Sequence, residues 1–206
     1  MSPRPYSLGR RAAGADETRA KIVDAAHALF TAADGFSGFS MDAVAKHAGV
    51  ARMTVYHHFH SKRRLLEALF DRISREHGLR RLAEAMADPD PRAALDQTIA
   101  IFAGFWSGER VLSRRLRAVA ALDPEVRETL RDRESWRRDL ATAIVKRAHA
   151  RYGTPSSPRE QRDAIDALFM LTGFDSFDAL AGDERDPQDV VPVVRQLALA
   201  ALGLSA

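Results

Sequence analysis

The side chains best suited to chemistry gather between Arg52 and Lys62, and they are cations and hydrogen-bond donors rather than nucleophiles or acids. His57, His58 and His60 are close enough in sequence to suggest a metal site, but no carboxylate or thiol stands beside them to complete a ligand set. Arginine, tyrosine, histidine and lysine side chains all donate hydrogen bonds to phosphate oxygens. The segment therefore favours contact with a polyanion, and we expect no metal and no cofactor.

Catalytic patterns are missing from the sequence, which has no nucleophile elbow, phosphate-binding loop, zinc motif or pair of carboxylates at a useful spacing. It also has no cysteine, which excludes disulfides and thiolate metal sites and is typical of a cytoplasmic protein. No apolar run approaches the roughly 20 residues that span a bilayer, and the basic start lacks the apolar core of a secretory signal. We therefore expect a cytoplasmic protein that is not an enzyme and enters no membrane.

Charge is distributed unevenly along the chain. The net charge is only +3, but residues 1–87 carry 14 Lys/Arg against 9 Asp/Glu, whereas residues 88–206 carry 17 against 19. A basic first part on a slightly acidic remainder suggests that the first part meets a polyanion such as nucleic acid.

The basic cluster lies within a pattern of short helices. An amphipathic stripe over residues 22–33 predicts a first helix, and Ser40 can cap a short second helix that Gly49 closes. A third short helix follows and presents Val55 and Phe59 inward. Two short helices joined through a glycine turn have the proportions of a helix-turn-helix, whose outer face is free to enter a major groove.

Apolar residues recur at helical spacing through the rest of the chain, so we expect an all-α protein of about nine helices. A connecting helix is expected over 65–87, and the Asp-Pro-Asp-Pro run at 88–91 is the clearest break. Later helices are expected at 124–153, 158–181 and 187–203, and the second of these follows a capping box with proline at its first position.

Residues 18–73 resemble the DNA-binding domain of TetR-type transcriptional regulators. The most specific part is AGVARMTVYHHFHSKRRLL, which is similar to the family pattern AGVS-x-GT-x-Y-x-HF-x-SK-x-x-LL at eleven of nineteen positions. The matching residues are Ala48, Gly49, Val50, Thr54, Tyr56, His58, Phe59, Ser61, Lys62, Leu65 and Leu66. The motif covers about the first third of the chain, and the remainder is similar only in length and helical character.

The resemblance implies that this region contacts double-stranded operator DNA. Arg52 opens the recognition helix and can reach a guanine or a phosphate, while Met53 and Thr54 meet base edges. Lys62 combines its charge with the positive end of the next helix, which makes it a phosphate clamp. The implied set is Ser40, Arg52, Met53, Thr54, Tyr56, His57, His58 and Lys62, and Arg4, Arg10 and Arg11 form a basic arm.

Two residues depart from the family pattern. Ala51 stands where serine or threonine is usual, so the recognition helix lacks a side-chain cap that contributes about 1 kcal/mol. Met53 stands where glycine or alanine is common, and its bulk is expected to change which base step is read.

In TetR-like proteins the C-terminal body encloses a pocket for a small inducer, and the resemblance implies the same here. Large apolar side chains and a polar pair on an apolar helix are the candidates, although each aromatic ring can equally fill a core. The candidate set is Phe102, Phe105, Trp106, Leu116, Trp136, Leu140, Phe169, Thr172 and Asp175. The arginines at 131, 133, 137 and 138 alternate with acids and are expected in surface salt pairs.

Together the resemblance implies a homodimeric repressor that leaves a palindromic operator when a small hydrophobic ligand binds. Helices near 158–181 and 187–203 would pair with a second subunit as a four-helix bundle. The alternative is a DNA-binding regulator without a small-molecule effector, controlled by a protein partner. The expected domains are a flexible basic arm at 1–15, a three-helix DNA-binding domain at 16–64, the connecting helix at 65–87, and an effector-binding and dimerisation domain at 88–206.

Overall fold

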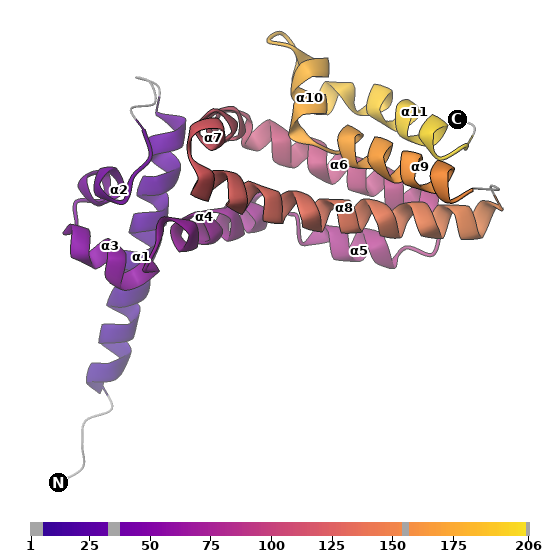
Figure 1. Ribbon diagram of the computed structural model, residues 1–206. Coiled ribbons are helices and arrows are strands. Elements are labelled where there is room, and N and C mark those ends of the chain that lie inside the picture. Colours follow the sequence, from indigo (N-terminus) through magenta and orange to yellow (C-terminus); the bar gives the residue numbers. More distant parts are fainter. Residues whose placement is uncertain (1–5, 33–37, 154–156, 205–206) are drawn as a thin grey trace. The chain divides into compact units, whose positions relative to one another are not determined.

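The computed structural model describes residues 6–32, 38–153 and 157–204, and within them the chain is all-α, as the sequence predicts (Figure 1). These residues form eleven α-helices and one short 3-10 helix, and none of them is in a strand. The helices are α1 (Tyr6–Thr31), α2 (Met41–Ala48), α3 (Arg52–Phe59), α4 (Lys62–Glu76), α5 (Arg81–Ala87), α6 (Pro91–Gly108), α7 (Arg110–Leu122), α8 (Pro124–Tyr152), α9 (Pro158–Leu171), α10 (Phe174–Ala181), the 3-10 helix η1 (Pro187–Val190) and α11 (Val191–Ala201).

The number of helices exceeds the predicted nine because two expected helices are broken. Gly78 adopts a left-handed conformation with φ +71°, so the connecting helix expected over 65–87 becomes α4 and α5. The helix expected over 158–181 ends at Leu171, where the Thr172 hydroxyl hydrogen-bonds back to the Leu168 carbonyl. Gly173 is then extended, and α10 begins after it.

The first helix starts earlier than the sequence suggests. Residues 6–15, which were expected to belong to a separate arm, are part of α1. Arg10 and Arg11 therefore stand on helical backbone, whereas Arg4 lies outside the described residues.

The described residues form two compact units. The head unit comprises residues 1–72 and 114–129, and the body unit comprises residues 73–113 and 130–206. In the head unit, the Arg115 guanidinium of α7 donates to the carbonyls of Phe30 and Ala32 at 2.8 and 2.9 Å. Phe30 lies in the last turn of α1 and Ala32 follows its last residue, so a residue far along the chain caps the first helix.

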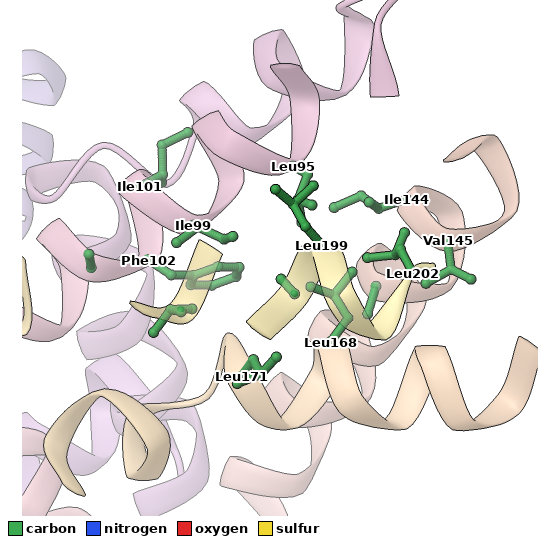
Figure 2. Packing of buried hydrophobic residues seen from close by; sticks show 14 of the residues in the cluster. Leu95, Ile99, Ile101, Phe102, Ile144, Val145, Leu168, Leu171, Leu199 and Leu202 are labelled. Atoms are coloured by element: carbon green, nitrogen blue, oxygen red, sulfur yellow. The ribbon is translucent and has the colours of Figure 1, made fainter. Parts of the chain in front are cut away.

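The body unit is organised around one apolar core. Figure 2 shows Leu95 and Ile99 of α6, Leu168 of α9 and Leu199 of α11 converging on a common interior. All four are between 0% and 3% exposed, and apolar residues of α5, α8, α10 and η1 complete the cluster. Because the cluster draws on six α-helices and η1, its burial fixes their packing.

No helix among the described residues combines the length and the apolar character needed to cross a bilayer.

Candidate nucleic-acid interface

The turn between α2 and α3 has the local chemistry that the sequence predicts. The Ser40 hydroxyl accepts a hydrogen bond from the Ala43 amide at 3.1 Å and caps α2. Gly49 ends the helix with φ +64°, a conformation that side-chain-bearing residues adopt at a cost. Its amide bonds to the Lys46 carbonyl at 3.2 Å. The chain thereby turns within three residues and starts α3.

The recognition helix α3 buries one face and exposes the other. Val55 and Phe59 are 0% and 2% exposed, as the pattern predicts, and the Arg19 guanidinium lies 4.4 Å from the centre of the Phe59 ring. On the outer face Met53 is 74% exposed. Ala51 makes no side-chain cap, in agreement with the departure seen in the sequence.

Four of the predicted DNA-contacting residues line one concavity of 430 Å³ in the head unit. They are Ser40, Arg52, Tyr56 and Lys62, contributed by the start of α2, the first turns of α3 and the start of α4. The other four, Met53, Thr54, His57 and His58, lie on α3 outside this lining. The sequence thus identified four residues of the lining and four further residues of α3.

The concavity also contains residues that the sequence analysis did not assign to DNA contact. Asp42, His60 and Glu125 belong to the same lining. Asp42 pairs with Arg52, with Oδ1 and Nε 2.9 Å apart, and the Arg52 Nη2 lies 3.5 Å from the Tyr56 hydroxyl. His60 has φ +62°, a left-handed backbone that costs about 1 kcal/mol for a residue with a side chain. Asp42 lies in the first turn of α2, the one local signal that could have drawn attention to it.

Lys62 is positioned at the start of α4 as expected, but its charge is already shared with two acids. Its Nζ lies 2.5 Å from Asp123 Oδ2 and 3.6 Å from Glu125 Oε2. Burial of the Asp123 carboxyl opposes its ionisation, yet hydrogen bonds from Lys62 and the Val126 amide outweigh this and lower its pKa. The ammonium is therefore engaged by an ionised carboxylate within the head unit.

His58 is biased toward its neutral form. Partial burial lowers its pKa first, and the neighbouring His57 ring and the Arg19 guanidinium lower it further. Among the residues described, no group of three or more histidine, aspartate or glutamate side chains is placed to hold a metal ion.

The candidate ligand-binding residues of the body gather only in part. Phe102, Phe105 and Trp106 of α6 pack together, with Trp106 stacked at 6.1 Å on Phe102 and edge-on at 4.7 Å to Phe105. The Trp106 indole N–H donates to the Thr172 carbonyl at 3.1 Å. Thr172 is buried, and its hydroxyl accepts from Arg137 at 3.3 Å. Arg137 is only 8% exposed, so the expectation that it belongs to a surface salt pair is wrong.

The remaining candidates lie apart from this cluster. Trp136 is 49% exposed and Asp175 is exposed, while Leu116 belongs to the head unit. Leu140 is half-buried against the body core. Phe169 is half-buried with the guanidinium groups of Arg137 and Arg138 at 4.0 and 4.2 Å from its ring centre. The break at 172–173 places Asp175 on α10 and Phe169 on α9, although the sequence predicts one continuous helix there.

Comparison with known proteins finds a family model that matches a segment within the first third of the chain. Residues 22–69 match the family model for bacterial regulatory proteins of the tetR family. The HTH-type transcriptional regulator SrpR of Pseudomonas putida is 44% identical over 70 residues, which are 34% of this chain and 32% of SrpR. The HTH-type transcriptional regulator TtgR, also of Pseudomonas putida, is 37% identical over 78 residues, or 37% of each chain. The matched segment thus spans about a third of either relative.

Solved structures extend the likeness to the whole chain at the level of the fold. A TetR transcription regulator from Haloarcula marismortui has a TM-score of 0.62 at 14% identity, covering 91% of this chain and 97% of the other. A TetR-like transcriptional regulator from a Rhodococcus species has a TM-score of 0.56 at 24% identity, covering 90% and 96%. At these identities the likeness establishes the fold of the body and nothing about what the body binds.

Proposed function

We propose that this chain is a ligand-released repressor, on the premise that it is a helix-turn-helix transcriptional regulator of the TetR family. The premise is supported by the family match of residues 22–69, by the relatives of that segment and by the fold. A homodimer would bind a palindromic operator through the two recognition helices. A small hydrophobic molecule bound in the body would lower the affinity for that operator. By linkage, DNA would lower the affinity for the ligand by the same factor.

The observation that carries DNA recognition is the shape and chemistry of the head concavity. Arg52, Tyr56 and Lys62 line it together, and the adjoining face of α3 is exposed because Val55 and Phe59 hold the opposite face in the interior. Arginine and tyrosine at the start of a helix can meet base edges and phosphates. The exposed Met53 supports an apolar contact with a thymine methyl group.

The body offers an apolar surface that supports the homodimer. Met170 on α9 is 60% exposed, and Val193 and Leu197 on α11 are 42% and 46% exposed. The two helices pack against each other within the body unit (Figure 1). Their outward apolar side chains suit burial against the same helices of a second copy, an isologous contact with two-fold symmetry.

Leu197→Glu is expected to convert the dimer into a monomer, because it would place a charge in an apolar contact. Sedimentation at micromolar concentration checks this. Val111→Glu is the control, since Val111 is 49% exposed on α7 rather than on either of these helices. A dimer that survives Leu197→Glu would contradict the assignment of the seam.

The aromatic cluster of α6 supports an effector that is apolar. Phe102, Phe105 and Trp106 pack together, Phe174 of α10 lies edge-on to Trp106, and the hydrogen bond from Trp106 to Thr172 adds a polar group beside these large rings. A thermal-shift screen with hydrophobic compounds tests the proposal, because a ligand of the native state raises the melting temperature. Binding compounds that never change operator affinity would favour control by a protein partner instead.

DNA recognition is tested by selecting bound duplexes from a random pool. The native protein is expected to recover a palindrome, whereas Arg52→Ala/Tyr56→Ala should recover none, since each contact contributes about 1–3 kcal/mol. Arg64→Ala is the matched control: Arg64 is a 72% exposed cation of α4 outside the lining. If the double variant recovers the same palindrome as the native protein, the concavity is not the recognition site.

A further inference from the structure

The first turn of α4 is an anion-binding arrangement that the protein's own carboxylates occupy. Lys62 Nζ contacts Asp123 Oδ2 and Glu125 Oε2, and the other Glu125 oxygen, Oε1, accepts the Arg63 backbone amide at 3.2 Å. Arg63 is the second residue of α4, so this amide is one of the donors that the helix leaves unsatisfied. Glu125 thus caps α4 from outside the helix while it approaches the lysine.

The acids are held in place by their own local structure. Asp123 Oδ1 accepts the amides of Glu125 and Val126 at 3.0 and 3.2 Å, which caps the start of α8. That leaves Oδ2 directed at Lys62. The side chains of Lys62 and Asp123 are only 21% and 23% exposed, so water screens this pair less than a fully exposed one.

A DNA phosphate would require the same donors. An ammonium group beside a helix N-terminus binds a carboxylate and a phosphate through the same hydrogen bonds and the same charge attraction. The pair between Arg52 and Asp42 differs, because those side chains are 62% and 59% exposed and their contact is weakly stabilising. The two cations of the concavity therefore differ in how readily they are released.

We propose that Asp123 and Glu125 compete with DNA phosphate for Lys62 and the Arg63 amide, so that the head binds DNA only by displacing them. We call the contact of Asp123 and Glu125 with Lys62 the acidic latch. It lowers affinity for every duplex alike, because phosphates carry no sequence information. This inference rests on the proposed DNA-binding function.

The test measures binding of a labelled random-sequence duplex at several salt concentrations. Glu125→Gln and Asp123→Asn/Glu125→Gln are expected to bind roughly three- to tenfold more tightly than the native protein. The plot of log affinity against log salt should steepen by about 0.9, the slope of one additional phosphate contact. Asparagine caps a helix as well as aspartate does, so α8 keeps its start.

Two further variants make the result specific. Glu128→Gln removes one negative charge from the next turn of α8, where Glu128 contacts Arg63 Nη1 at 3.5 Å but reaches neither Lys62 nor an α4 amide. Its slope should equal that of the native protein. Adding Lys62→Gln to the double variant should abolish the gain, because the released ammonium is then missing.

Unchanged affinity and slope in both carboxylate variants, with native thermal unfolding, would overturn the latch. Weaker binding would overturn it as well, since the acids would then be orienting Lys62 toward DNA. If the double variant unfolds, the single variant Glu125→Gln, which keeps the α8 cap, tests the latch. Failure of the native protein and every variant to bind any duplex would instead refute the proposed function.

Discussion

The head concavity contains ion pairs, whereas the body core is apolar. The concavity has partly exposed ion pairs, Arg52 with Asp42 and Lys62 with Asp123, whereas Leu168 and Phe177 of the core are 0% exposed. An exposed ion pair contributes about 0–1 kcal/mol to stability, but a fully buried leucine or phenylalanine contributes about 1.5–3 kcal/mol. The interior therefore supplies most of the stability, and the surface proposed to bind DNA supplies little of it. Substitutions in the two regions should have separable effects.

The largest expected effect is in the body core. Leu168→Ala should lower the free energy of unfolding by about 2–5 kcal/mol, because it leaves a cavity among α6, α9 and α11. Denaturant titration measures this loss. At a temperature where the variant is still folded, its affinity for a selected operator should equal that of the native protein. A changed affinity in the folded variant would show that the two regions are not separable.

A second effect in the body concerns two glycines of the same helix. Gly108→Ala should lower the free energy of unfolding by about 1–3 kcal/mol, since the new methyl group would overlap the His77 ring. Moving that ring breaks its 2.8 Å contact with Glu109, which is 3% exposed.

Gly104 is the matched control, because a methyl group there meets nothing within 4 Å beyond its chain neighbours and the backbone of its own helix. Gly104→Ala should raise the free energy of unfolding by up to about 1 kcal/mol through helix propensity. Thermal unfolding of both variants measures the contrast. Similar losses in both would mean that α6 tolerates no side chain along this stretch, and that the His77 contact is not the cause.

The parts of the fold that the sequence predicts are those governed by local chemistry. Ser40, Gly49 and the Ser157 capping box act within a few residues of themselves, and each has the expected structure. The breaks at Gly78 and at Thr172–Gly173 escaped prediction because glycine and threonine also occur within continuous helices. Only the packing of the surrounding body decides that the chain turns there.

The candidate site divides in the same way. The motif brought Arg52, Tyr56 and Lys62 to one place because they lie within eleven positions on two adjoining helices. Asp123 directly precedes the helix that the sequence predicts at 124–153, and its side chain caps that helix. Its second role, contact with Lys62, joins residues 61 positions apart, and no periodicity or spacing rule carries information over that distance.

A smaller effect tests whether the buried hydroxyl groups of the body interior are satisfied by hydrogen bonds. Thr98 is 0% exposed, and its hydroxyl has no hydrogen-bond partner among the described residues. Thr98→Val should therefore raise the free energy of unfolding by about 1 kcal/mol, because an unsatisfied buried hydroxyl is removed at nearly constant volume.

Thr172→Val is the contrasting variant. It should lower the free energy of unfolding by about 1 kcal/mol, since that hydroxyl bonds to the Leu168 carbonyl and to Arg137. Denaturant midpoints compare the two. A loss in Thr98→Val would show that its hydroxyl is satisfied in solution, for example by a buried water molecule.

The smallest effect is at His58, where stability and DNA binding should respond to pH in opposite directions. Burial, the His57 ring and the Arg19 guanidinium lower the pKa of His58, so the folded head resists its protonation. The unfolded chain protonates first as pH falls below about 6.5, and the native protein should lose stability there relative to His58→Gln. A phosphate beside the ring would favour the imidazolium, so DNA affinity should rise over the same interval in the native protein more than in the variant. Unfolding and binding titrations at about pH 7.5 and 5.5, on either side of the ordinary histidine pKa, measure both trends. If the two proteins show the same pH dependence of binding, His58 packs within the head and does not contact the backbone of DNA.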